Sequence, residues 1–366
     1  MPGLITNILS TDFTVLYHDS VHDFLSLAYP TLRCAEGSSN IILAHALKRV
    51  SAEAAITDCQ FVSQSDIDRV WAERDMACSP PPYRSTEISH SFWLTLWSSP
   101  TPSGPPTLDL VLSCLSWTLG DYPIFIWSPH QFQSSVALLP RVARLAENLI
   151  ACIPPERVFA VFGTTPLVKT FARYWTELTG FHPDSEPFYA ALLTYCTADT
   201  FQRSEHVPPT NHYLRHATMA DLEPVAQLGQ EFANDSVYYP LNIEAARVEA
   251  EELIRKGQIW VYDADGEITT ICAVTRNSLN VSSITKVYTA VPWRKRGCAQ
   301  HLVRYVTSIL LFECHKRSVV LYVGHTNSAQ YVYDKVGFVG LCGKDRPSGV
   351  EDSLELGFVG TRRGHW

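Results

Sequence analysis

The stretch that decides the fold is VYTAVPWRKRGCAQHLV, residues 287–303, followed after a short interval by TNSAQYVYDKVGF, residues 326–338. The first segment starts as a β-branched strand, passes a basic turn and reaches Gly297, which opens an amphipathic helix. Backbone N–H groups at such a junction have no intrahelical partner and can surround a diphosphate, whose charge the helix N-terminus also favours. The second segment predicts a strand exit and a short helix that carries Tyr333.

The chain around these segments predicts an α+β domain with a mixed sheet flanked by helices. A capping box at Thr218 and Asp221 begins its first helix, Gly257 ends its second, and Asp265–Gly266 is a hairpin turn. The expected strands are 212–217, 259–263, 268–275, 283–289, 319–323 and a closing pair at 338–342 and 353–359. The expected helices are 218–234, 243–256, 298–315 and 328–335.

The N-terminal part predicts a vaguer version of the same order, which indicates a degenerate duplicate of the second domain. Pro/Ser-rich passages at 79–85 and 98–107 predict surface loops, and the polar passage 200–210 predicts a linker. We therefore expect one domain over residues 1–199 and another over 211–366. The expected helices of the first are 21–28, 41–50, 135–151 and 167–179, and its strands are 91–97, 109–115, 124–127, 157–162 and a pair near 188–195.

Bulk composition narrows the class of protein. At 366 residues the chain exceeds the usual size of one core, and its 46% hydrophobic content is typical of packed globules. A net charge of -8 disfavours a general nucleic-acid binder, which presents a basic face. No apolar run of about 18 residues predicts a membrane span, and the N-terminus lacks the pattern of a signal peptide. We expect a cytoplasmic protein.

The ten cysteines and the histidines show no metal-ligand spacing. The cysteines form no CxxC motif and are expected to be reduced thiols that pack as small hydrophobic side chains. His212 and His216 are four residues apart, but they lie on a predicted strand. We expect no metal.

The basic turn and Tyr333 each have a plainer interpretation. A WRKR segment alone is also typical of a solvated turn, and a tyrosine beside a sheet can simply pack there. If the strand 319–323 lies next to 283–289, however, the Tyr333 helix lies beside an acyl thioester bound at this site. A phenol of pKa about 10 could then donate a proton to a departing thiolate, whose thiol has a pKa of about 8.5.

The order VYT, RxxGxA and N(x)5Y(x)3GF resembles the acetyl-CoA-binding and tyrosine motifs of the GNAT superfamily of N-acetyltransferases. The resemblance covers about residues 211–359. It implies a splayed mixed sheet, an acyltransferase that transfers groups other than amino-acyl groups, and acetyl-CoA as co-substrate. Lys295 departs from the motif, because many members have glycine there, and Asn327 precedes the tyrosine by six residues where seven is commoner.

Site residues follow from the resemblance position by position. Tyr333 corresponds to the general acid, and Asn327 to an amide contact with the cofactor. The strand that pairs with the acetyl group and pantetheine arm, and the loop that holds the pyrophosphate, comprise Val287, Tyr288, Thr289, Arg294, Lys295, Arg296, Gly297, Cys298, Ala299 and Gln300.

The opening domain resembles the N-terminal half of a two-domain branch of the superfamily, through FLSLAYPTLRCAEGSSNIILAHAL at residues 24–47. Its own strand-to-helix junction at 124–139, IFIWSPHQFQSSVALL, has no RxxGxA and no glycine. We therefore expect the first domain not to bind acetyl-CoA. It is expected to shape the acceptor pocket or a dimer contact, in a monomer or homodimer.

The expected reaction is direct attack of a small-molecule amine on the acetyl thioester in a ternary complex. The strand 281–289 contains no Asp or Glu, so the proton acceptor must lie elsewhere. Glu231, Asp235 and Tyr238 could line the acceptor side, and a water chain is the other candidate. A protein or peptide N-acetyltransferase and a non-catalytic acyl-CoA-binding protein are the alternatives.

Overall fold

The structure is a computed structural model, and it describes residues 12–53, 91–99, 105–117, 119–132, 135–204, 208–235 and 238–365. The loop predicted at 79–85 lies outside the described residues, as does the middle of the one predicted at 98–107.

Among the described residues, the first half of the chain contains ten principal elements. In chain order they are β1 Asp12–His18, α1 Val21–Cys34, α2 Asn40–Glu53, β2 Phe92–Ser99, β3 Thr107–Cys114, β6 Ile124–Trp127, α4 Ser135–Cys152, β7 Ala160–Thr164, α5 Thr165–Thr179 and β8 Tyr189–Thr197. A small separate hairpin, β4 Ser116–Trp117 with β5 Gly120–Asp121, precedes β6.

The second half repeats the same order of strands and helices. Its elements are β9 His212–His216, α6 Leu222–Asn234, α7 Ile243–Arg255, β10 Ile259–Ala264, β11 Glu267–Asn277, β12 Val281–Thr289, α8 Cys298–Ser308, β13 Ser318–Gly324, α9 Gln330–Asp334 and β14 Glu351–Gly357. Local signals set the boundaries as expected: Thr218 and Asp221 form the capping box, and Asn242 caps α7. The repeat confirms tandem α+β halves.

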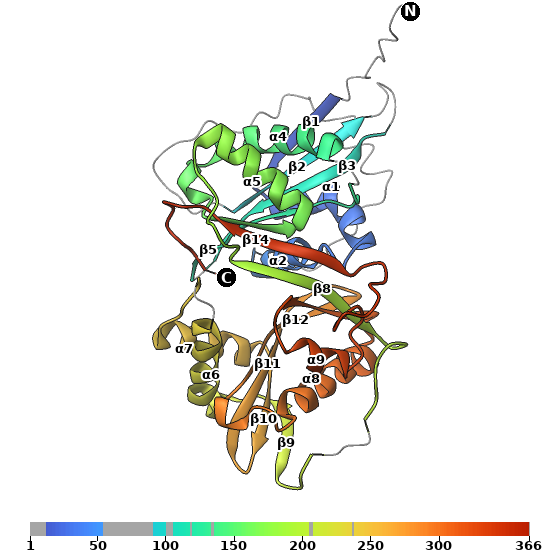
Figure 1. The fold of residues 1–366 in the computed structure, drawn as a ribbon, viewed down its shortest axis with the longest axis vertical. Helices are drawn as coiled ribbons and strands as arrows, with labels where there is room; N and C mark the ends of the chain where they lie inside the picture. The colour runs from blue at the N-terminus through green and yellow to red at the C-terminus, as the bar shows by residue number, and fades with distance from the viewer. Residues whose placement is uncertain are drawn as a thin grey trace, which may run out of the picture.

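The two halves exchange their last strands. Among the described residues, twelve strands form one sheet in the order β1-β2-β3-β6-β7-β14-β8-β13-β12-β11-β10-β9. β8, from the first half, pairs with β13 of the second, whereas β14, from the end of the second half, pairs with β7 of the first. β8 and β14 pair with each other at the centre, where Figure 1 shows them side by side. The sheet therefore runs without a break through both halves.

Helices cover both faces of this sheet in each half. In the first half, α4 and α5 pack on one face and α1 and α2 on the other. In the second half, α8 and α9 cover the face equivalent to that under α4 and α5, while α6 and α7 cover the opposite one. Helix α2 also contacts β11 and β12, so the first half covers part of the second.

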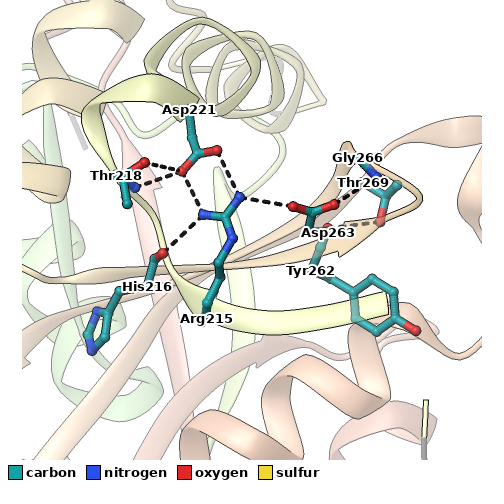
Figure 2. A network of polar contacts seen from close by, with 8 residues as sticks. All are labelled: Arg215, His216, Thr218, Asp221, Tyr262, Asp263, Gly266 and Thr269. Atoms are coloured by element: carbon teal, nitrogen blue, oxygen red, sulfur yellow. Dashed lines mark hydrogen bonds and ion pairs between the residues drawn. The ribbon is translucent and has the colours of Figure 1, made fainter. Parts of the chain in front are cut away.

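A polar network stabilises β9, the edge strand of the second half (Figure 2). The Arg215 guanidinium donates to both carboxylate oxygens of Asp221, at 2.7 and 3.0 Å, and to Asp263 on β10 at 3.0 Å. Asp221 also accepts from the Thr218 backbone and hydroxyl. These contacts, with Arg215 first, lower the pKa of Asp221 to about 2.

Predicted helix 21–28 is longer in the structure, where it runs to Cys34, and three other predicted elements differ in kind or number. The predicted strand 338–342 is a turn, because Gly340 and Cys342 have left-handed φ angles of 71° and 55°, which no strand accommodates. The predicted pair near 188–195 is the single strand β8, which pairs on both sides. Helix 298–315 ends as α-helix at Ser308 and continues as a π-helical turn at Ile309–Glu313.

Candidate functional site

The sheet opens between β12 and β13. These parallel strands pair only from Val281 with Ser318 to Ile284 with Leu321. Beyond Ile284, β12 remains paired with β11 as far as Thr289, and β13 remains paired with β8 as far as Gly324. The backbone of residues 285–289 therefore faces a gap, where an extended ligand could take the place of the missing ladder.

The three predicted β12 residues alternate across the sheet at this gap. Val287 packs with the α8 side of the core, whereas the buried Tyr288 packs with α6 and α7. The Thr289 hydroxyl shares a hydrogen bond of 3.0 Å with Thr270, and the Thr289 carbonyl accepts from Arg294 at 3.1 Å. The Arg294 guanidinium also lies 5.1 Å from the centre of the Tyr288 ring, so Arg294 connects the loop to the strand.

The loop after β12 delivers the N-terminus of α8 to the mouth of the gap. Lys295 and Gly297 both have left-handed φ angles, 64° and 86°. Gly297 is the N-cap of α8 and supplies no capping side chain, so the first-turn amides are left to an external acceptor. Arg294, Lys295 and Arg296 are exposed around them. This is the geometry and charge that a diphosphate requires.

The remaining loop residues extend the site along α8. Cys298 is buried against the sheet, and burial raises the pKa of its thiol, so it packs as an inert side chain. Ala299 and Gln300 are half-buried. Gln300 lies with Arg304 in a groove between α8 and the segment after α9, which also contains Lys335 and Lys344.

Tyr333 and Asn327 lie on the β13 side of the gap. Tyr333 is buried on α9 in the same core as Val287 and Cys298, with its ring 5.8 Å from Phe338. Burial raises the pKa of Tyr333 well above its ordinary value, which keeps the phenol protonated but makes it a weaker acid. The Asn327 side-chain oxygen accepts from the Ala329 amide at 2.9 Å, so this side chain also caps the turn before α9.

The three predicted acceptor-side residues do not form one cluster. Asp235 is exposed and forms an ion pair with Arg294 at 3.4 Å, beside the loop. Glu231 is half-buried on α6 and accepts from Gln227 at 3.0 Å. Tyr238 stacks on Phe188 with ring centres 4.1 Å apart, which brings the α6–α7 loop onto the first half.

Sequence reasoning missed a buried ion pair next to the gap. Lys286 lies on the part of β12 that does not pair with β13. Its Nζ atom lies 2.6 Å from the Oε2 atom of Glu249 on α7, and the two side chains are only 12% and 23% exposed. The ammonium also lies 5.4 Å from the centre of the Phe232 ring. The sequence feature that could have indicated this ion pair is Lys286 itself, because it is a charged residue inside an otherwise uncharged strand. Its partner could not be found, because Glu249 reads as one of several acids on α7.

The equivalent parallel pair in the first half is shorter and remains in backbone contact just beyond its paired residues. β6 and β7 are parallel and pair at Ile124 with Val161 and at Phe125 with Phe162. In the next position the backbones are so close that a Cβ on Gly163 would lie 2.4 Å from the Ile126 carbonyl oxygen. The two halves thus share a topology, but they differ in how closely the two parallel strands approach beyond the paired stretch.

Part of the second half matches a known family. Residues 230–349 match the family described as Acetyltransferase (GNAT) domain, a range that contains the gap, the α8 loop and Tyr333. The second half carries a GNAT acetyltransferase domain. This match places the domain among the acyltransferases. None of the curated proteins matches the chain by sequence.

Solved structures show the same fold over nearly the whole chain. A GCN5-related N-acetyltransferase from Sphaerobacter thermophilus aligns at 14% identity and a TM-score of 0.51, covering 96% of this chain and 97% of that one. A Drosophila protein aligns at 13% identity and a TM-score of 0.56, covering 94% of this chain and 98% of that one. Both alignments extend well beyond the matched GNAT domain and include the first half.

Two further observations concern the described residues alone. Within the ranges given above, no helix is long and apolar enough to cross a bilayer. Within the same ranges, no group of three His, Cys, Asp or Glu side chains could hold a metal ion. His212 instead pairs with the Tyr262 hydroxyl at 2.8 Å.

Proposed function

We propose that the chain transfers the acetyl group of acetyl-CoA to the amine of a small molecule, by direct attack in a ternary complex. The observation that carries this proposal is the open β12–β13 pair, with an uncapped helix N-terminus at its mouth and a buried tyrosine beside it. The first half, whose strand-to-helix junction at 124–139 has no RxxGxA and no glycine, binds no acetyl-CoA in this proposal.

Each group in the gap has a role in the proposed reaction. The first-turn amides of α8 and the cations at 294–296 hold the pyrophosphate. Backbone groups of 285–289 replace the lost strand ladder and hold the pantetheine arm, and one N–H polarises the thioester carbonyl as charge develops on oxygen. Tyr333 donates a proton to the departing sulfur. Asn327 contributes its remaining amide donors to the cofactor.

A small acceptor suits the face on which the amine would arrive. Helix α2 packs on β11 and β12, and the α6–α7 loop stacks on Phe188. A site covered from both sides admits a small amine more easily than a polypeptide segment. The amine must also lose a proton, and an aliphatic amine of pKa near 10.4 costs about 4 to 5 kcal/mol to deprotonate at pH 7.

The test is thiol release from acetyl-CoA across a panel of amines, with wild type and Tyr333→Phe. We expect amine-dependent release by wild type and a loss of about 10² to 10⁴ in kcat for the variant, since a positioned proton donor contributes that much. The affinity of Tyr333→Phe for acetyl-CoA, measured by calorimetry, should equal that of wild type.

Tyr331→Phe is the matched control, because Tyr331 lies on the same helix and is 65% exposed. It should retain wild-type kcat. Cofactor binding without stimulation by any amine would refute the enzyme assignment, whereas a fully active Tyr333→Phe would refute only the role of the tyrosine.

A further inference from the structure

Lys286 and Glu249 form their ion pair on the face of the sheet opposite α8, directly at the gap. Lys286 lies within residues 285–289, whose backbone faces the gap, and its side chain points away from that of Val287, which packs on the α8 side. With exposed fractions of 12% and 23%, the two charged side chains are both in contact with solvent. A ligand bound at this stretch of β12 can therefore reach the pair.

Packing alone does not account for this ion pair. Taking two charges out of water costs about as much as their attraction returns, so a partly buried pair adds little net stability. Lys286 is also the one charged residue in the β12 sequence VSSITKVYT. A charge at this position, beside an open stretch of backbone, indicates a role in binding.

The Lys286 ammonium keeps donors for a ligand. An ammonium has three N–H groups, and Glu249 is the acceptor that Lys286 bonds among the described residues. The Phe232 ring, 5.4 Å from the ammonium, adds an apolar wall. An ammonium with remaining donors binds a carboxylate through charge-assisted hydrogen bonds.

A second cation lies on helix α2, which packs on the same face of the sheet. Lys48 interacts electrostatically with Lys256 and Glu252 at the end of α7, and these two already pair with each other at 2.6 Å. Burial and two neighbouring cations lower the pKa of Lys48 to about 8, so it is still mainly charged at pH 7. Burial lowers the pKa of His365, which interacts with both members of the ion pair, so its imidazole is neutral. The charges between α2 and α7 therefore favour an anionic group in the ligand.

We propose that the acceptor is an amino acid, whose carboxylate binds the Lys286 ammonium while its α-amine attacks the thioester. This inference rests on the proposed acetyl transfer and names its substrate class. The carboxylate and the α-nitrogen are attached to the same carbon, so a carboxylate held by Lys286 brings the nitrogen to the acceptor side of the gap. The neutral nitrogen forms the C–N bond, the C–S bond breaks, the sulfur receives the Tyr333 proton, and one N–H proton passes through solvent to the tyrosinate.

Other small amines match these charges less well. A diamine or polyamine would bring its second ammonium towards Lys286 and Lys48, and like charges repel each other. An amine with an uncharged tail would leave the remaining Lys286 donors without an acceptor, which costs binding free energy. The amino acid satisfies both conditions.

The experiment measures kcat/KM of the full-length enzyme at saturating acetyl-CoA, for the common amino acids and for the amines that lack their carboxylate. Alanine with ethylamine and phenylalanine with phenethylamine are two such pairs. We expect wild type to favour the amino acid by about 10- to 10²-fold, as hydrogen bonds to charged groups contribute that much. Lys286→Met combined with Glu249→Gln should bring this ratio to about one, and removing both charges leaves no buried acid unpaired. Lys286→Arg, which keeps the cation, should retain most of the preference.

Arg255→Met combined with Glu251→Gln is the matched control, since this exposed ion pair lies on the same helix as Glu249. It should keep the wild-type ratio. An effect on folding alone would lower both rates of a substrate pair and leave their ratio as it is. A ratio near one in wild type, or a wild-type ratio in the Lys286 and Glu249 double variant, would overturn the inference and leave the acetyl transfer standing. Failure of wild type to acetylate any amine or amino acid would refute the proposed function itself.

Discussion

Gly297 shows at the residue scale how a backbone angle can create a binding site. Its φ of 86° directs the chain into α8, and an added Cβ would meet nothing closer than the His301 ring at 3.6 Å. Space is therefore available for a side chain, and the cost of one is conformational. For a residue other than glycine, the left-handed region costs about 1 to 2 kcal/mol.

Gly297→Ala should weaken acetyl-CoA binding by about tenfold, because the loop would relax its left-handed turn and misdirect the first-turn amides. Titration calorimetry measures the effect. Gly257→Ala is the matched control, since Gly257 also has a left-handed φ, 61°, in open space at the end of α7. Gly257→Ala should lose a similar amount of folding stability, while its affinity for acetyl-CoA stays unchanged. A wild-type affinity of Gly297→Ala for acetyl-CoA would contradict the expected role of Gly297.

The sequence located residues near the helix junction better than those on distant strands. Gly297 and the buried Cys298 follow from a local motif, in which each residue's environment depends on its neighbours in the chain. The ion pair of Lys286 with Glu249 could not be found this way, because it joins a strand and a helix that lie far apart in the sequence.

The edge strand β9 shows at the element scale how side chains replace a missing strand neighbour. Arg215 links β9 to β10 and to the start of α6 through two carboxylates. Bidentate guanidinium pairs of this kind are stronger than single contacts, and they require planar geometry that lysine lacks. The network therefore holds a strand that pairs on one side only.

Arg215→Lys should lower the free energy of unfolding by about 1 to 2 kcal/mol at pH 7. The depressed pKa of Asp221 gives this contribution a pH window: it is present above the ordinary value of 3.8 and is lost as pH falls towards about 2. Urea unfolding of wild type and variant at pH 7 and pH 2.5 measures the loss of stability and its dependence on pH. Arg255→Lys, at an exposed pair on α7, should change little, and an equal loss in both variants would contradict the role of the network.

Most elements could be predicted from periodicity and caps, and the exceptions have local causes. The segment 338–342 has the apolar content of a strand, but its left-handed residues turn the chain instead. The exchange of β8 and β14 between the halves could not be predicted. Hydrophobic alternation identifies a strand and its buried face, but not which half of the molecule supplies its partner.

At the scale of the whole molecule, the strand exchange makes each half depend on the other. Each half contributes its last strand to the core of the opposite half. The halves are also joined by Glu36, whose carboxylate accepts from the backbone and side-chain nitrogens of Asn280 at 2.8 and 2.6 Å. The predicted boundary at 199 to 211 separates the repeats in sequence, whereas the pairing of β8 and β14 joins them in space.

Fragments 1–199 and 200–366 should therefore fail to fold alone, because each would expose an unfilled sheet edge. Mixed together, they should form one complex of one copy each. Circular dichroism and size-exclusion chromatography distinguish these outcomes. Cooperative unfolding of either isolated fragment as a monomer would contradict this expectation.

The position of β14 also sets an order of events during synthesis. Domains of a growing chain usually fold from the N-terminus as each is completed. Here the first half cannot complete its sheet until Glu351–Gly357, which follows the other strands of the second half in the chain, has been synthesised. For most of that time β7 exposes an unpaired apolar edge. The nascent chain should therefore be a substrate for chaperones that shield such edges.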